Sequence, residues 1–113
     1  MALPARHLRV TVAIPERRML AAMDPRDDSL RSYLAESYLP RIRRAELRDA
    51  ARRAQLAAEA LAEEGVRVRH VRTSFLPDDE VCLHVFEAPS AEAVCETMRR
   101  AALAVDRIVE TVE

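Results

Sequence analysis

Several residue types that support common functions are scarce or missing in this 113-residue chain. Lysine and tryptophan are absent, one glycine occurs, and the aromatic residues are two tyrosines and two phenylalanines. A single glycine excludes the GxGxxG and P-loop motifs, because each needs several glycines around a phosphate. The GxSxG nucleophile elbow is also missing. Binding of dinucleotides or nucleoside triphosphates through those loops is therefore not expected, and no catalytic triad stands out.

The charge balance gives little support for a polyanionic or membrane partner. Eighteen basic residues, all arginine, face nineteen acidic ones, for a net charge of −1. Arginine without lysine, beside abundant alanine, is typical of coding in a GC-rich genome. The few aromatics do not interleave with the arginines, so nucleic-acid binding by stacking is not expected. No run of about eighteen apolar residues is present, so no membrane span is predicted.

The two cysteines and the chain length indicate a small cytoplasmic domain. Cys82 and Cys95 do not form a CxxC pair, and no signal peptide is recognisable, which favours reduced thiols in the cytoplasm. The length suits one domain with a modest, alanine-rich core. Such a core often gains stability when subunits pair, so a homodimer is expected.

The pattern of apolar residues predicts a ferredoxin-like α+β domain over residues 32–113. Residues 1–31 are expected to be an N-terminal extension with a short strand or a poorly ordered arm. From there the predicted order is strand 33–39, helix 46–64, strands 66–75 and 81–87, a helix capped by Ser90, and strand 107–112. Gly65 follows the first helix, where positive φ is needed. This β-α-β-β-α-β order predicts a four-stranded antiparallel sheet with two helices on one face.

The hairpin sorts its residues by chemistry onto two faces, because side chains alternate along a strand. With Phe75 placed opposite Val81, one face is apolar and is expected to be the core: Val71, Thr73, Phe75, Val81, Leu83 and Val85. The other is polar and is expected to be open: His70, Arg72, Ser74, Cys82, His84 and Phe86.

The polar hairpin face supplies the candidate metal ligands. His84 and Cys82 lie two apart on one strand, and His70 lies one strand over. Imidazole and thiolate both suit nickel, zinc or copper, and Glu36 on the first strand could add a carboxylate. The alternative is that these side chains fill a dimer interface. Arg72, placed opposite His84, would bind an anion or pair with a carboxylate.

Two further sets of charges have alternative interpretations. Glu110 could approach Glu36 and form an acid–base pair, or could simply be a solvated edge residue. The first helix carries a basic stripe near its start and acidic residues near its end, which opposes its macrodipole. An anion, or the acidic end of another subunit's helix, would relieve this arrangement. The residues are Arg41, Arg44, Arg48, Arg52, Glu59, Glu63 and Glu64.

Four blocks of the sequence resemble a family of small bacterial ferredoxin-like proteins known as nickel-binding, many of which carry only a domain-of-unknown-function label. The blocks are residues 35–40 (AESYLP), 70–75 (HVRTSF), 79–89 (DEVCLHVFEAP) and 106–110 (DRIVE). The resemblance covers about residue 32 to the end. It implies a homodimer of ferredoxin-like subunits that binds nickel.

These observations leave three hypotheses. The leading one is a dimeric nickel-binding protein with His84, His70, Glu36 and Cys82 as metal-contacting groups on the open face. The alternative is a dimeric α+β barrel enzyme or small-molecule-binding module. In that case His84 or Glu36 would move protons in a cavity lined by His84 and Arg72. The third is a structural module whose open face serves only self-association.

Overall fold

The computed structural model describes residues 30–112, and these form one sheet covered by two helices. The elements run β1 (Arg31–Tyr38), α3 (Arg44–Glu63), β2 (Arg69–Leu76), β3 (Val81–Ala88), α4 (Ala91–Arg100) and β4 (Arg107–Thr111). This confirms the β-α-β-β-α-β order and the ferredoxin-like fold. The extension predicted for residues 1–31 lies almost wholly outside the described residues.

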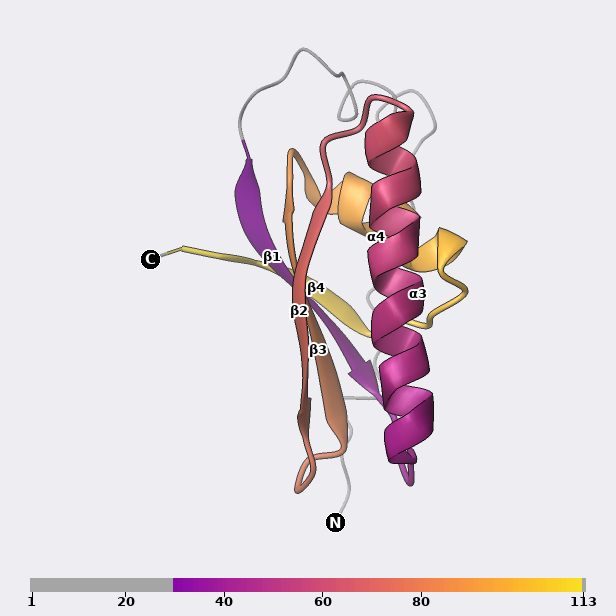
Figure 1. Ribbon diagram of the computed structural model, residues 1–113. Coiled ribbons are helices and arrows are strands. Elements are labelled where there is room, and N and C mark those ends of the chain that lie inside the picture. The colour runs from indigo at the N-terminus through magenta and orange to yellow at the C-terminus, as the bar shows by residue number, and fades with distance from the viewer. Residues whose placement is uncertain (1–29, 113) are drawn as a thin grey trace.

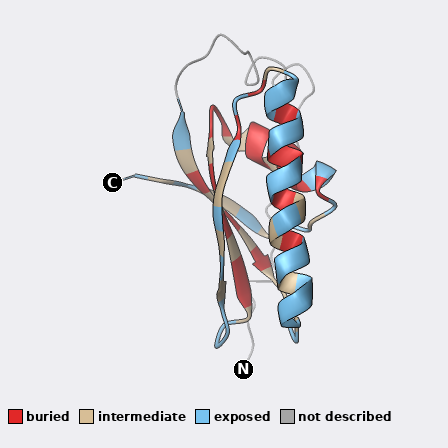
Figure 2. Ribbon diagram, viewed as in Figure 1, coloured by how far each residue is buried: buried red, intermediate tan, exposed pale blue. Residues whose placement is uncertain are grey.

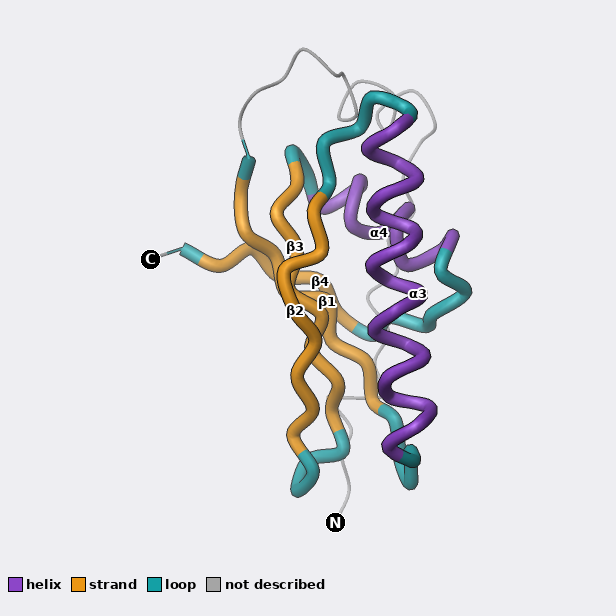
Figure 3. Tube along the Cα trace, viewed as in Figure 1, coloured by secondary structure: helices purple, strands orange, loops and turns teal. Residues whose placement is uncertain are grey.

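The sheet is antiparallel throughout, with strand order β2-β3-β1-β4. The first and third strands, β1 and β3, are therefore the central ones. Both helices lie on one side of the sheet and leave the other side without a helix (Figure 1). The path of the chain in Figure 3 shows the same two layers. Among residues 30–112, no helix is long and apolar enough to cross a membrane.

The core lies between the helices and the sheet, and α3 contributes mostly alanine to it. Its buried positions are Ala50, Ala54, Ala57, Ala58 and Leu61, and they form the inward stripe of the helix seen in Figure 2. Small side chains let a helix approach a sheet closely. On the sheet, the core is made by alternate residues of the two central strands, among them Tyr33, Ala35, Phe86 and Ala88.

Local signals mark the start of α4 and the end of α3. The Ser90 hydroxyl caps α4 by accepting a hydrogen bond from the amide of Ala93 at 3.1 Å. Gly65 has φ of 99° just after α3, a conformation that costs a residue with a Cβ atom energy. The end of α3 is tied to α4 by Arg100, whose guanidinium donates to Glu64 and Glu96.

The hairpin register differs from the prediction in two ways that cancel at one end. Leu76, and not Phe75, lies opposite Val81, so the turn is one residue shorter than expected. A β-bulge at Val71 then shifts the pairing back, and His70 lies opposite Phe86. Between these two points each β2 residue shares a face with the β3 set opposite to the one predicted, so that Thr73 lies beside His84 and Arg72 beside Val85.

Candidate functional site

For β3, the face predicted to be open is the one that the helices cover, whereas Arg72 and Ser74 of β2 are exposed as predicted. His84, Cys82 and Phe86 are 1%, 0% and 0% exposed, and they belong to the face that the helices cover. The prediction that this set is open is therefore wrong. The helix-free face, called the open face below, carries the alternate residues of the strands: Leu34, Glu36, Leu83, Val85, Arg72, Ser74, Arg107 and Val109.

The exposure of the two faces of β3 was predicted wrongly because a strand pattern does not specify which face is buried. Alternation sorts residues into two sets, but it does not say which set faces the helices. Here the set with more polar atoms is buried because its polar atoms find partners within the fold. No buried side-chain nitrogen or oxygen among the described residues lacks a hydrogen-bond partner.

A continuous polar network, called the histidine network below, joins His70, Thr73, His84 and Cys82 beneath the helices. His70 Nε2 lies 2.9 Å from Thr73 Oγ1, and the same oxygen lies 2.7 Å from His84 Nδ1. On its other side, His84 Nε2 lies 3.5 Å from Cys82 Sγ. The chain of contacts runs from a half-buried imidazole to a fully buried thiol.

Thr73 couples the proton positions of the whole network, because its hydroxyl has one proton to donate. If Thr73 donates to His84 Nδ1, then His84 donates from Nε2 toward the Cys82 sulfur. If His84 instead donates from Nδ1 to Thr73, its Nε2 lone pair faces the Cys82 thiol and accepts from it. Thr73 was not among the sequence-based candidates. It joins the network because the shorter turn places it opposite His84.

Burial sets the protonation of the network. It lowers the pKa of His84 to about 4, with a smaller contribution from the charge of His70. Burial also lowers the pKa of His70 and raises the pKa of Cys82 to about 11. At neutral pH the imidazoles are thus neutral and the thiol is protonated. Phe86 packs beside both imidazoles, with its ring centroid 5.4 Å from that of His70 and 6.4 Å from that of His84.

The structure brings together three of the four predicted metal-contacting residues and separates the fourth. His70, His84 and Cys82 share the buried face. Glu36 lies on the open face, opposite Leu83, with its carboxylate 3.7 Å from the guanidinium of Arg107. Glu36 and His84 therefore cannot share an ion within one subunit.

The arginine and the second carboxylate that the sequence placed near this group are also elsewhere. Arg72 lies opposite Val85 on the open face, and not opposite His84. A cavity lined by both Arg72 and His84 is thus ruled out within one subunit. Glu110 lies opposite Tyr33, whereas Glu36 lies opposite Arg107, so the two carboxylates project to different faces. An open cleft of about 670 Å³ does exist, but it is lined from Leu39 to Arg53 and by Leu103, away from the histidine network.

The donors fit a metal ion only in part. Ligands at about 2.3 Å for sulfur and about 2.0 Å for nitrogen, at a tetrahedral angle, lie about 3.5 Å apart, using distances typical of zinc. The Sγ–Nε2 distance of 3.5 Å between Cys82 and His84 matches this separation. Across residues 30–112, however, no three histidine, cysteine or acidic side chains converge to hold one ion. The subunit supplies a pair of donors and not a complete site.

Comparison with known proteins identifies the family. No curated protein and no solved structure matches the chain significantly. One family model does match, over residues 33–111, and it describes the nickel-responsive protein SCO4226-like family. The match covers more than half of the chain and spans every strand and helix described above except the first two residues of β1. The chain therefore belongs to the SCO4226-like family of nickel-responsive proteins.

Proposed function

We propose that this protein binds nickel, and that His84 and Cys82 are the metal-contacting pair. Membership of a nickel-responsive family supports the choice of metal. The spacing of Cys82 Sγ and His84 Nε2 supports the choice of ligands, and it is the observation that carries the proposal. When bound, the ion would supply a cross-link between two donors of β3.

The surroundings of His84 suit an imidazole that coordinates through Nε2. Its Nδ1 is held by Thr73 at 2.7 Å, and a partner of this kind fixes the tautomer and the orientation of a ligating ring. His84 needs no deprotonation above about pH 5, since burial keeps its pKa near 4. His70 acts on the other nitrogen of His84, through Thr73, so we assign it an orienting role and not a place in the ligand pair.

The remaining ligands must come from outside the described residues or from solution. Because His84 and Cys82 are buried, an ion reaches them only when the sheet and α3 separate locally. We therefore expect slow uptake of the metal. Cys82 must also lose a proton whose pKa is about 11, so the affinity rises by about tenfold per pH unit between pH 6 and 8.

The test is nickel titration of untagged, chelator-stripped protein, followed by calorimetry and by absorption of the thiolate–nickel bond. We expect saturable binding with that absorption in the wild type, and its loss in Cys82→Ser and in His84→Ala. Cys95→Ser is the matched control, because Cys95 is the other free thiol and lies on α4. Equal binding by all four proteins would refute the ligand assignment. Absence of binding by the wild type would refute the proposed function.

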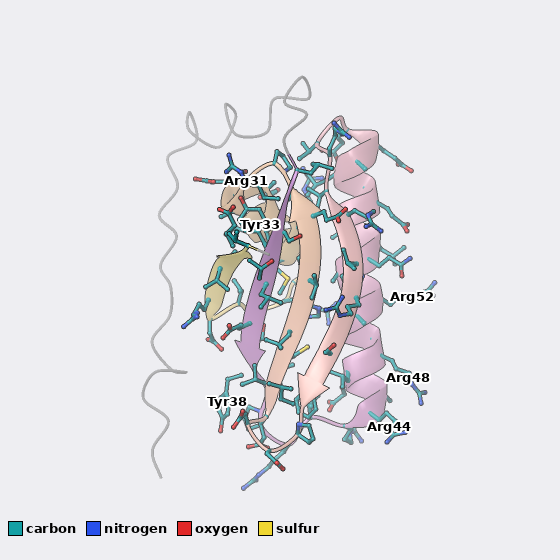
Figure 4. All side chains as sticks on the ribbon, turned by 90° about the vertical axis from the view of Figure 1, so that its left-hand side faces the viewer. Arg31, Tyr33, Tyr38, Arg44, Arg48 and Arg52 are labelled. Carbon is teal, nitrogen blue, oxygen red and sulfur yellow. The ribbon has the colours of Figure 1, made fainter. Side chains whose placement is uncertain are left out.

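We further propose that the open face joins two subunits into a homodimer. Apolar side chains on this face are only half-buried in one subunit: Leu34, Leu83, Val85 and Val109. Three of the four belong to the central strands, where a second sheet would cover them. In Figure 4 the open face is turned toward the viewer, with no helix in front of it. Glu36 would then lie within the interface between subunits.

Light scattering on the size-exclusion eluate tests this second proposal. We expect a dimer for the wild type and a monomer for Val85→Arg, because a buried arginine opposite another sheet has no partner. Ser74→Arg, on the same face but on edge strand β2, is the matched control and should weaken the dimer less. A wild-type monomer at high concentration would refute the proposal.

A further inference from the structure

The outward face of α3 is divided into a basic half and an acidic half. Arg44, Arg48 and Arg52 occupy the first half, at spacings of four residues, and Glu59 and Glu63 continue the same stripe in the second half. All five are exposed, and they lie on the side of the helix opposite to its buried alanines. In Figure 4 the three arginines project sideways from α3, at the right of the picture. Within residues 30–112 none of the three makes an ion pair.

The order of charges along this stripe is complementary to itself. Three pairs of positions lie at equal distances on either side of a midpoint between Arg53 and Ala54. They are Arg44 with Glu63, Arg48 with Glu59, and Arg52 with Gln55. A second α3, antiparallel and related by a two-fold axis at this midpoint, would place each arginine opposite its complementary partner.

The helix dipole favours the same arrangement. Arginines near the positive N-terminus of α3 and glutamates near its negative C-terminus oppose the macrodipole of their own helix. In an antiparallel pair, the glutamates of one helix lie beside the N-terminus of the other. At the N-terminus the neighbour's glutamates add to the one acidic residue of the first turn, Glu46, and at the C-terminus its arginines supply the basic charge that the last turn of α3 lacks.

The uncharged residues of the stripe permit close approach. Ala45 and Ala62, which are also related by the midpoint, are exposed alanines at the two ends. Leu56, near the centre, is 50% exposed and is among the large apolar residues that the fold leaves uncovered. A nucleic acid would meet the acidic half of the stripe and be repelled by it, whereas a second copy meets complementary charge at both ends of the stripe.

We propose that the outward face of α3 is a self-association surface that binds the same face of a second copy, antiparallel. This surface is separate from the open face of the sheet. A protein with two isologous surfaces on different faces links its dimers into tetramers or longer chains. The proposal stands whether or not the protein binds nickel or pairs through its sheet.

Charge-reversal variants of the full chain test the pairing directly by sedimentation velocity at low salt. Two double variants are compared: the arginine variant, Arg44→Glu/Arg48→Glu, and the glutamate variant, Glu59→Arg/Glu63→Arg. Each turns four complementary contacts of the helix pair into like-charge contacts. We expect each to weaken association by about 30-fold or more. An equimolar mixture of the two variants restores complementarity at every contact and should associate again.

The variant that carries all four reversals is the matched control. It has the net charge of the wild type and a reversed but still self-complementary stripe. It should therefore associate with itself and not with the wild type. Raising the salt to 0.5 M should weaken both self-associations, because the charges are exposed.

Three results would overturn the proposal. The first is association of either double variant as strong as that of the wild type, and the second is a four-reversal variant that does not self-associate. The third is that the arginine variant associates with itself as the wild type does but, unlike the wild type, does not bind duplex DNA. That result would assign the arginines to a nucleic acid. Repeating the experiment in the Val85→Arg background separates this contact from the open-face dimer.

Discussion

Acid should begin to destabilise this protein at a pH above the range in which carboxylates titrate, because a neutral histidine is buried in its core. The perturbation is a decrease in pH from 7 to 4.5. His84 has a pKa of about 4 in the folded protein and an ordinary value of 6.5 when exposed. Between these values the unfolded chain binds a proton that the folded protein does not bind, so the free energy of unfolding falls as the pH falls.

The size of the effect follows from the difference between the two pKa values. Each unit of difference corresponds to about 1.4 kcal/mol, so the full effect of His84 is roughly 3 kcal/mol, complete well below pH 4. Between pH 7 and 4.5 the loss is about 2 kcal/mol. His70 acts in the same direction, since burial lowers its pKa as well. This loss is absent well above pH 6.5, where His84 is neutral in both the folded and the unfolded protein.

Urea denaturation at pH 7, 6, 5 and 4.5, followed by circular dichroism, measures this loss. The variant His84→Gln keeps a hydrogen-bonding side chain that does not titrate, so its free energy of unfolding should change by about 2 kcal/mol less over the same range. The burial of neutral His84 would be refuted if wild type and variant showed the same pH dependence. Arg99 and Arg100 lower the pKa of Glu96 to about 2, so the stability from these ion pairs is lost mainly below about pH 4.5. Because His84→Gln keeps Glu96, the comparison with the wild type isolates the contribution of His84.

Three further substitutions test the packing around the site, each by the free energy of unfolding at pH 7. Thr73→Val removes the partner of His84 Nδ1 and should lower the free energy of unfolding by about 1–3 kcal/mol. A decrease below about 0.5 kcal/mol would count against the histidine network. Ser90→Ala removes the cap of α4 and should cost about 1 kcal/mol, whereas Ser90→Asp should retain most of the stability. Arg100→Met breaks the link from α4 to Glu64 and removes one partner of Glu96, so it should lower the free energy of unfolding; an unchanged stability would show that Arg99 alone satisfies Glu96.

Most of the fold could be predicted from local signals in the sequence. The apolar period of α3, the single glycine after it and the serine before α4 each specify a boundary through nearby contacts, and each was confirmed. The order of elements then restricted the sheet to few topologies, so the central position of β1 and β3 followed from the chain order.

The candidate site was only partly predictable, because it depends on distant contacts. The hairpin pattern identified His84, Cys82 and His70 as neighbours on one face. It could not show that Thr73 joins them, because a turn one residue shorter changes the parity of the strand. Nor could it show that the face with the imidazoles is buried. Side chains such as Val85 and Leu83 look like a core in sequence, yet they lie on the open face.

The bulge at Val71 allows this hairpin to lose one residue without moving any side chain to the other face of the sheet. Because Val71 is the extra residue, its deletion would leave His70 opposite Phe86 and Arg69 opposite Glu87, with the pairing from Arg72 to Leu76 unchanged. The imidazole would stay on the covered face and the chemistry of both faces would be kept. Among related proteins, a gap of one residue at this point is therefore compatible with the same site. An alignment that places the gap instead between Arg72 and Leu76 would pair residues from opposite sides of the sheet.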